Sequence, residues 1–304
     1  MLITVFTPTY NRAYTLERVF DSLMKQSFSH LDFEWIVIND GSTDNTDHLV
    51  AKFLKKADFE IIYLKQENRG KNYCHNRAVS IARGELFLIL DSDDAITPEC
   101  MDVFWKYWKN LNEQLKSEIY GINCLCKDGY TGKLIGHEVK GGVVNNAYKH
   151  KHKNKIYFDG WGALNTSLFK KNLFPEIEGI KFIPEAYLWD SVGNHRKVLS
   201  VNDILKNVYY QKDGFSNDII KSYKNHSQGR YIYHQMVINE LFNELFKYNK
   251  IRLLKDLIQF GRMGFHSGYS SLIILKDVKK FFKKVIVFFV LPFSFYFYKK
   301  DCNA

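Results

Sequence analysis

The chain has 304 residues, 46% of them hydrophobic, which is enough for a sizeable core and argues against an intrinsically disordered protein. Its net charge is +10, but residues 1–100 hold only 11 Lys and Arg against 15 Asp and Glu. This acidic first third argues against a nucleic-acid binder, and five cysteines without a Cys-x-x-Cys pair argue against a disulfide framework or a zinc site.

Apolar runs alternate with helical spacing over the first hundred residues. Strands are predicted at 2–6, 34–40, 60–66 and 85–90, and helices at 13–27, 42–57 and 71–84. Gly84 is predicted to close the third helix as its C-cap. This regular alternation of strands and helices predicts an α/β fold, with a mostly parallel sheet flanked by helices.

Each predicted strand ends in a polar, turn-prone segment. These segments are TPTYN (7–11), NDGSTD (39–44), NRGKN (68–72) and DSDD (91–94). Because ligands of parallel sheets bind beyond the carboxyl ends of the strands, we expect the four segments to form one binding edge. The first segment lacks the Gly-x-Gly-x-x-Gly of nicotinamide-dependent dehydrogenases, and the third is not the phosphate-binding loop of nucleoside triphosphatases.

The fourth segment is unusual, because a buried strand runs directly into Asp91, Asp93 and Asp94. Three neighbouring carboxylates repel one another unless a positive charge lies among them. Two carboxylates one residue apart can share Mg²⁺ or Mn²⁺, hard cations that use one or two carboxylates together with phosphate oxygens. An acidic turn that caps a helix opening at 97–99 is the structural alternative.

The rest of the chain carries weaker signals. A helix with an aromatic stripe is predicted at 100–111, and residues 230–260 have the spacing of amphipathic helices. The basic run at 149–155 is interpreted as a solvated loop and not as a metal or nucleic-acid patch, because neither of its histidines has a carboxylate or cysteine nearby in the sequence. A glycine-broken stretch at 158–165 has the composition of an active-site rim.

Three segments together resemble glycosyltransferase family 2, which has the GT-A fold. They are VFTPTYNRAYTLERVFDSLMKQSF, EWIVINDGSTDNT and NRGKNYCHNRAVSIARGELFLILDSDD. The resemblance covers residues 3–98 with the spacing of all four strand-end motifs intact, fits 99–210 loosely and does not extend to 211–304. It implies a catalytic domain at 1–210, which we expect to be followed by a helical extension at 211–275 and a separate segment at 276–304.

The resemblance implies that the enzyme moves a hexose or N-acetylhexosamine from a nucleotide sugar with inversion. Thr7, Pro8 and Tyr10 would lie against the base of the donor. Asp40 would accept the uracil N3–H, which favours a UDP-sugar, and Ser92 would belong to the same donor site.

The resemblance also implies separate roles for the three aspartates of the acidic segment. Asp91 would contact the ribose or the sugar, and Asp93 would hold Mn²⁺ or Mg²⁺, with Asp91 and Asp94 as further candidate ligands. For Asp94, the capping of a helix is an equal alternative.

In the third loop the chain departs from the family's commonest Ala-Arg-Asn and has Cys-His-Asn, ending at Asn76. Lys71 would direct a positive charge toward the donor diphosphate or its sugar, although an exposed lysine at a helix start is the structural alternative. Gly70 would allow a close backbone approach, and Asn76 would complete the donor-binding residues.

Inverting transfer needs a base that takes the proton of the acceptor hydroxyl. The family usually carries a Glu-Asp pair for this purpose in its second half, and this chain lacks the pair. The candidates are Glu185 in FIPEAYLWD (182–190) and, as runner-up, Asp190. A helix-capping role for Glu185 is the structural alternative, and an inactive scaffold subunit of a polysaccharide assembly complex is the functional alternative.

The C-terminal stretch 276–300 joins lysines at both ends to a 14-residue apolar, aromatic run at 285–298. About 20 apolar residues span a bilayer, so this run is predicted to lie on an anionic membrane surface instead of crossing it. A helix packed on the core of the protein is the alternative. With no signal peptide expected from the N-terminal sequence, we expect a cytoplasmic enzyme on the inner face of the membrane, beside a saccharide or lipid-linked saccharide acceptor.

Overall fold

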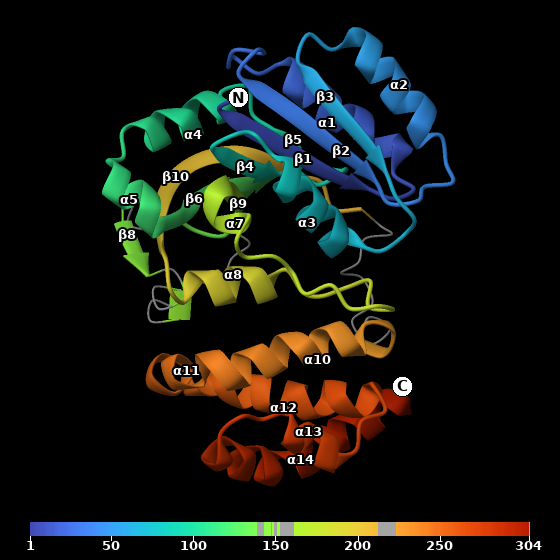
Figure 1. Ribbon diagram of the computed structural model, residues 1–304, viewed down its shortest axis with the longest axis vertical. Helices are drawn as coiled ribbons and strands as arrows, with labels where there is room; N and C mark the ends of the chain where they lie inside the picture. The colour runs from blue at the N-terminus through green and yellow to red at the C-terminus, as the bar shows by residue number, and fades with distance from the viewer. Residues whose placement is uncertain (139–142, 147, 149–150, 153–160, 212–222, 304) are drawn as a thin grey trace. The chain divides into compact units, whose positions relative to one another are not determined.

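The computed structural model describes residues 1–138, 143–146, 148, 151–152, 161–211 and 223–303. The chain divides into two compact units (Figure 1). The first comprises Met1–Ala147, Tyr157–Phe174 and His195–Gln211, and the second comprises Tyr148–Ile156, Pro175–Asn194 and Lys212–Ala304. This division differs from the domains expected from sequence, because 175–194 groups with the C-terminal helices and 276–304 is not separate from the helical extension.

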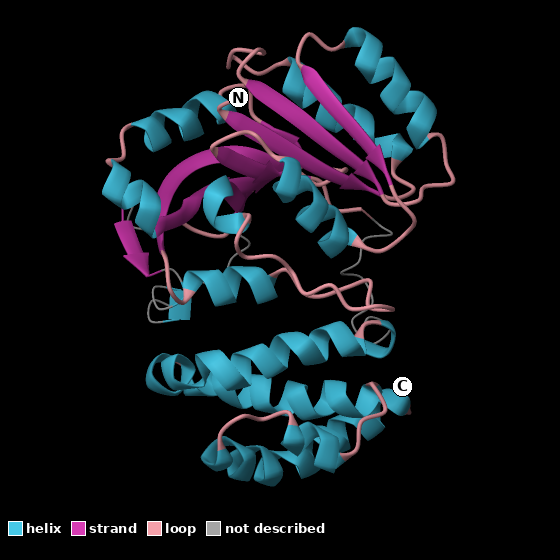
Figure 2. Cartoon of the chain, viewed as in Figure 1, coloured by secondary structure: helices cyan, strands magenta, loops and turns pink. Residues whose placement is uncertain are grey.

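One mixed sheet of ten strands organises the described part of the first unit (Figure 2). The order along the sheet is β3-β2-β1-β4-β9-β6-β10-β5, with β7 paired to β6 and β8 to β10. The strands are β1 (Ile3–Thr9), β2 (Phe33–Asn39), β3 (Glu60–Lys65), β4 (Leu86–Ile89), β5 (Ala95–Ile96), β6 (Ile119–Asp128), β7 (Leu134–Ile135), β8 (Val143–Asn146), β9 (Trp161–Asn165) and β10 (Lys197–Val208). β1 to β4 are mutually parallel, as predicted, whereas β9 runs antiparallel to both β4 and β6.

Helices cover both faces of this sheet, which is why its first strands are apolar on both sides. The helices of this unit are α1 (Ala13–Met24), α2 (Thr46–Lys56), α3 (Lys71–Ile81), α4 (Cys100–Lys109), α5 (Glu113–Glu118) and α7 (Thr166–Phe169). The apolar sides of α1, α2 and α4 enclose one buried cluster with Ile3 and Val5. On the other face α3 brings the His75 ring against Phe6 and Phe87.

Two helix boundaries differ from the expectation. α3 ends at Ile81, so Gly84 is not its cap; a Cβ at Gly84 would lie 2.4 Å from the Thr4 nitrogen, and glycine is needed there for the close approach to β1. α2 begins at Thr46 and not at 42, because the preceding turn is bonded to the first loop of the chain, with Thr43 N donating to Asn11 Oδ1 at 2.8 Å.

The second unit is helical over its described residues. Its elements are α8 (Ala186–Gly193), α10 (Ser227–Met236), the π-helical turn η1 (Val237–Leu241), α11 (Phe242–Tyr248), α12 (Lys250–His266), α13 (Ser271–Lys276) and α14 (Phe281–Cys302). Their apolar sides form a core of their own around Phe260 and Met263. The predicted helical region 230–260 is thus several elements, with a break at Asn249, whose side chain accepts from Arg252 N at 3.0 Å and caps α12.

The apolar run at the C-terminus belongs to a longer helix than the run itself. α14 has 22 residues and continues through Pro292. By length and composition alone, it is the one helix in the described part of the chain that could cross a membrane, and 22% of its most apolar window is buried. It is therefore neither too short to span nor wholly enclosed in the core.

Candidate active site

Because strands β1 to β4 are parallel, the four strand-end segments lie at one edge of the sheet. β1 stays in register with β2 as far as the pair Thr9 and Asn39, and with β4 as far as Phe6 and Ile89. Beyond β4, Leu90 N still donates to Phe6 O at 2.8 Å, and Asp94 N donates to Asp91 O at 3.1 Å. The acidic segment therefore turns sharply at the carboxyl edge, where the sequence predicts a binding site.

Two lysines lie among the three carboxylates. Lys71 Nζ is 2.5 Å from Asp91 Oδ1. Lys206 Nζ is 2.6 Å from Asp94 Oδ2 and 4.0 Å from Asp91 Oδ2. These ammonium groups provide the positive charge that the acidic segment requires.

Lys206 is a site residue that the sequence analysis missed. It comes from β10, more than a hundred residues downstream, and its side chain is 8% exposed. Its ammonium also lies 5.6 Å from the centre of the Trp161 ring. The available signal was a lysine directly after Ile204 and Leu205 in a strand-like stretch, since a lysine on a buried strand needs a carboxylate partner.

Asp93 is the acid of this group that is not paired with a lysine or arginine among the described residues. Burial, together with repulsion from Asp94 and Asp91, raises the pKa of Asp93. Burial alone would raise the pKa of Asp91 as well, but Lys71 and Lys206 outweigh it and hold that pKa below its ordinary value. Burial raises the pKa of Asp94, although Lys206 opposes the shift.

The donor set fits a cation held mainly by its substrate. Within the described ranges, no group of three or more His, Cys, Asp or Glu is arranged to hold a metal. A half-buried carboxylate whose negative charge is destabilised by its neighbours nevertheless suits a divalent cation. Asp93 therefore fits Mg²⁺ or Mn²⁺ as one protein ligand beside phosphate oxygens, whereas Asp91 and Asp94 already have ammonium partners.

Asp40 organises the third loop. Its Oδ1 accepts from Gln66 Nε2 at 2.8 Å and from Arg69 N at 2.9 Å, and its Oδ2 accepts from Gly70 N at 2.8 Å. Gly70 has φ +96°, a backbone conformation that favours glycine, and it directly precedes Lys71 at the start of α3. The carboxylate thus fixes the loop that presents Lys71 to Asp91.

The first loop contributes surface mainly through its tip. Tyr10 is 49% exposed and Pro8 is half-buried. Thr7 is fully buried, and its Oγ1 accepts from Trp35 Nε1 at 2.9 Å, so the predicted contact with a donor cannot come from this hydroxyl. Asn11, at φ +52°, donates its backbone N–H to Ser42 Oγ at 3.0 Å and joins this loop to the second.

Asn76 lies in the core and not on the donor loop. Its Nδ2 donates to Phe174 O at 2.9 Å, and its Oδ1 accepts from Phe174 N at 2.9 Å. This two-point bond holds a distant segment against α3, so the predicted donor contact is corrected to a structural role. The neighbouring His75 is enclosed by aromatic rings, and burial together with Lys71 lowers its pKa to about 3, which keeps it neutral.

Three further predictions concern Ser92, the rim stretch 158–165 and the basic run 149–155. Ser92 is buried within the acidic turn at 9% exposure. In the rim stretch, Trp161 Nε1 donates to Ile89 O at 2.5 Å, beside the end of β4, while 158–160 lie outside the described residues. Most of the basic run 149–155 also lies outside them.

The two candidate bases belong to the second unit. Glu185 directly precedes α8, is half-buried and makes no side-chain capping bond to that helix. Asp190 is 5% exposed; its Oδ2 accepts from Tyr233 Oη at 2.8 Å, and its Oδ1 accepts from Lys151 Nζ at 3.3 Å. Asp190 is thus part of a buried network, whereas Glu185 lies at a half-buried position.

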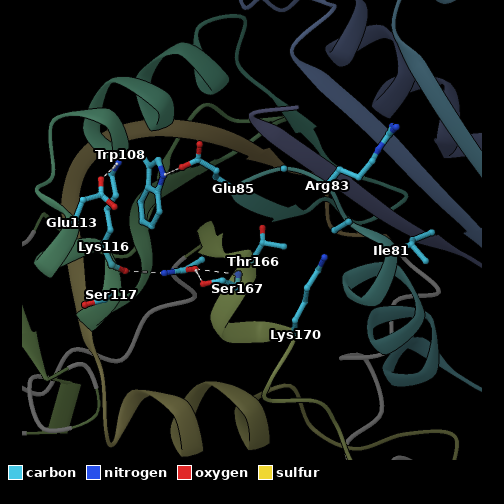
Figure 3. A pocket seen from close by; sticks show the side chains of 13 residues that line it. Ile81, Arg83, Glu85, Trp108, Glu113, Lys116, Ser117, Thr166, Ser167 and Lys170 are labelled. Atoms are coloured by element: carbon cyan, nitrogen blue, oxygen red, sulfur yellow. Dashed lines mark hydrogen bonds and ion pairs between the residues drawn. The ribbon is translucent and has the colours of Figure 1, made fainter.

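A cavity of about 660 Å³ opens elsewhere on the first unit (Figure 3). Gly84 and Glu85, which precede β4, form part of its wall, as do Trp108 and Lys170. Trp108 Nε1 donates to Glu85 Oε2 at 2.8 Å in that wall. Since the cavity adjoins the amino end of β4, it is distinct from the aspartates that follow the carboxyl end.

We expect the substitution Lys206→Met to destabilise the protein by about 3 kcal/mol or more at neutral pH, because it leaves the buried Asp94 carboxylate without its cation. The pKa of Asp94 is raised in the folded state. Its contribution to the free energy of unfolding is therefore stabilising below the unfolded-state pKa, where the carboxyl is protonated, and is lost as pH rises through the folded-state pKa. The deficit should therefore shrink at acidic pH, as urea unfolding at several pH values would show.

Lys197→Met is the matched control on the same strand. Its ammonium pairs with Glu118 at 2.5 Å, with 44% and 33% of the two side chains exposed. Such a pair contributes about 0–1 kcal/mol. Equal losses of stability in the two variants would refute the buried role of Lys206.

Comparison with known proteins shows the family. The profile described as "Glycosyl transferase family 2" matches residues 4–172, more than half of the chain. The glycosyltransferase GlyA of Streptococcus pneumoniae is 32% identical over 185 residues, which are 58% of this chain and 25% of that protein. The poly(ribitol-phosphate) beta-N-acetylglucosaminyltransferase TarS of Staphylococcus aureus is 36% identical over 101 residues, 33% of this chain and 18% of that enzyme. The chain thus matches only a minor part of the length of these relatives.

Solved structures agree on the fold. The crystal structure of S. aureus TarS superposes with a TM-score of 0.59 at 19% identity, covering 100% of this chain and 54% of that one. The mannosyltransferase PcManGT of Pyrobaculum calidifontis, solved with GDP-Man and Mn²⁺, gives 0.54 at 14% identity and covers 99% of this chain and 84% of that one. The predicted GT-A fold is confirmed, and the chain belongs to glycosyltransferase family 2.

Proposed function

We propose that the protein is a metal-dependent inverting glycosyltransferase that moves a sugar from a UDP-sugar to a saccharide acceptor in the synthesis of a bacterial surface polysaccharide. The observation that carries this proposal is the carboxyl edge of β1 to β4, where Asp40 fixes the loop before Lys71 and Lys71 meets the acidic turn. That edge combines the exposed aromatic ring of Tyr10, the ammonium group of Lys71 and the Asp93 carboxylate, which suits a divalent metal. Together these groups match the base, the phosphates and the metal of a nucleoside diphosphate.

We assign each step of the reaction to a particular residue. Asp93 would hold the divalent cation, which neutralises the departing diphosphate. Lys71, 37% exposed, is close enough to the open edge to bind a donor phosphate, while Lys206 remains buried and pairs with Asp94. Glu185 would take the proton from the acceptor hydroxyl as it attacks the anomeric carbon.

The choice of a uridine nucleotide depends on Asp40. Crystal structures of TarS exist with UDP and with UDP-GlcNAc, which supports the same class of donor here. Although both carboxylate oxygens of Asp40 already accept bonds, a carboxylate has about four acceptor positions, so uracil N3–H can add one more.

We expect the parent to bind UDP about ten-fold to a hundred-fold more tightly than Asp40→Ala does, as one charged hydrogen bond would provide. Calorimetric titration of both proteins measures this, with GDP and TDP titrated alongside; thymine N3–H can make the same bond, so Asp40→Ala should weaken TDP binding as well. Because Asp40 also holds the third loop, Gln66→Ala is the control: it removes one bond to Oδ1 but keeps the carboxylate. Unchanged UDP affinity in Asp40→Ala would reject this role.

The names of the relatives suggest the acceptor. TarS is a poly(ribitol-phosphate) beta-N-acetylglucosaminyltransferase, and a relative from Bacillus spizizenii is a poly(ribitol-phosphate) beta-glucosyltransferase. We therefore propose transfer of a hexose or N-acetylhexosamine to a surface saccharide, lipid-linked while it is assembled. A panel of nucleotide sugars with Mn²⁺, assayed for release of the nucleoside diphosphate, tests the proposal. If no donor is turned over with or without saccharide acceptors, the inactive-scaffold alternative is favoured.

A further inference from the structure

One face of α14 is fixed within the second unit. Near its start, Lys283 Nζ donates to the carbonyl oxygens of Ile238 and Asn239 at 2.8 and 2.9 Å. Near its end, the Asp301 carboxylate accepts from Arg262 Nε at 2.7 Å and contacts His266 Nε2 at 2.8 Å. Polar bonds at both ends therefore hold the helix along its length.

The middle of the same face is closely packed. A Cβ added to Gly261 of α12 would lie 2.6 Å from Ser294 Oγ, so the two helices approach closely there. Leu291 and Val287 complete the buried stripe at 5% and 1% exposure. α14 is thus an integral part of the helical unit and not a detached tail.

The opposite face of α14 is aromatic and open. Its large exposed side chains are Phe281 82%, Phe282 48%, Val285 40%, Phe288 59%, Phe289 69%, Phe293 63%, Phe295 45% and Tyr296 64%. We call these residues the outer face of α14. Phe282 also contacts Phe242, which stacks on the exposed Phe246 of α11, so the apolar surface extends beyond the helix. So many rings in water on one face mark an interaction surface.

Positive charge borders the outer face at both ends. Lysines 276, 279, 280 and 284 lie around the start of α14, and lysines 299 and 300 lie in its last turn. The acids of this segment are Asp277, which accepts from Tyr231 Oη at 2.8 Å, and Asp301, which is bound to Arg262. An aromatic stripe between lysines is complementary to a bilayer whose headgroups are anionic.

We propose that the outer face of α14 docks the protein on an anionic lipid bilayer, with the helix lying in the interface while its inner face stays packed on α12. A membrane-spanning α14 would have to leave α12 and place Lys283 and Asp301 near hydrocarbon without their partners. A symmetric pair of outer faces would bring the lysine clusters of two copies together. The inference goes beyond the transfer reaction and places the enzyme on a membrane surface, where a lipid-linked acceptor would lie.

Sedimentation of the full-length protein with lipid vesicles tests this docking. Binding is expected to vesicles of phosphatidylcholine with phosphatidylglycerol, and it should weaken without the anionic lipid or at high salt. Phe288→Ser/Phe289→Ser/Phe293→Ser should abolish binding, with unchanged circular dichroism and thermal unfolding because the three rings are exposed. Tyr130→Ser, which removes a 65% exposed ring from the first unit, is the control and should bind as the parent does.

The charge contribution is measured separately. Lys279→Ala/Lys280→Ala/Lys284→Ala should weaken binding to the anionic vesicles by about five-fold for each lysine removed. UDP release by these variants should equal that of the parent when a soluble acceptor is used, since none of the substituted residues belongs to the donor site. The docking proposal can therefore fail while the transfer reaction stands, and the reverse also holds.

The depth of α14 separates an interfacial helix from a spanning one. In Phe289→Trp, the added fluorescence should be quenched more by lipids brominated near the headgroup than by lipids brominated near the chain ends. Alkaline carbonate should release the protein from membranes. Resistance to carbonate, or binding to neither type of vesicle, overturns the proposal. So does a dimer in solution that the triple phenylalanine variant dissociates, since a second copy would then cover the face.

Discussion

Replacing Asp93 with alanine is expected to lower turnover by about three orders of magnitude or more. The raised pKa of Asp93 reflects burial and repulsion by Asp94 and Asp91, and a bound divalent cation would relieve this repulsion. A metal in such a site supplies several kcal/mol of stabilisation to the leaving diphosphate. Steady-state release of the nucleoside diphosphate by Asp93→Ala measures the loss, and chelation of the parent protein with EDTA should reproduce it.

Asp102→Ala is a suitable control, because it removes an exposed acid from the next helix, outside the acidic turn. Its turnover should match that of the parent. Metal affinity should also fall as pH decreases through the raised pKa of Asp93, since a proton then competes with the cation. Full activity of the parent in EDTA would rule out the metal role.

The second large effect is expected for Glu185→Gln, which preserves the size of the side chain but cannot accept the acceptor proton. Turnover should fall by about two to four orders of magnitude. UDP affinity should stay near the parent value, because the donor residues belong to the first unit. Single-turnover kinetics together with UDP titration separate the two quantities.

Asp190→Asn provides the contrast. This change weakens the bonds that Asp190 accepts from Tyr233 and Lys151, so it should lower the unfolding midpoint more than it lowers turnover per folded molecule. If Asp190→Asn instead loses turnover with unchanged stability, and Glu185→Gln does not, then Asp190 is the base.

The sequence predicted the parallel half of the sheet because its information there is local. Apolar runs, helical spacing and turn residues follow one another within each strand and helix, so β1 to β4 and α1 to α3 were found with boundaries that differ by a few residues. The larger differences arose from contacts between distant segments. Gly84, for example, follows α3 as a cap would, but it is required by the approach of the chain to Thr4.

The missed parts of the site depend on long-range pairing. Lys206 reaches Asp91 and Asp94 only because β10 pairs with β5, and nothing near Lys206 in the sequence indicates that neighbour. Asn76 looked like a donor ligand from its place in a motif, yet its amide is bonded to Phe174. The sequence specified chemical types at the edge of the sheet, while the partners of each side chain followed from the assembled fold.

A crystal structure of the protein with UDP and Mn²⁺, in which the anomalous scattering of manganese locates the metal, tests the role of Asp93 and of the carboxyl edge together. We expect one anomalous peak within ligand distance of the Asp93 carboxylate and of the diphosphate, with uracil beside Asp40 at the carboxyl edge of β1 to β4. A nucleotide bound in the cavity beside Trp108, or a manganese peak away from Asp93, would contradict it.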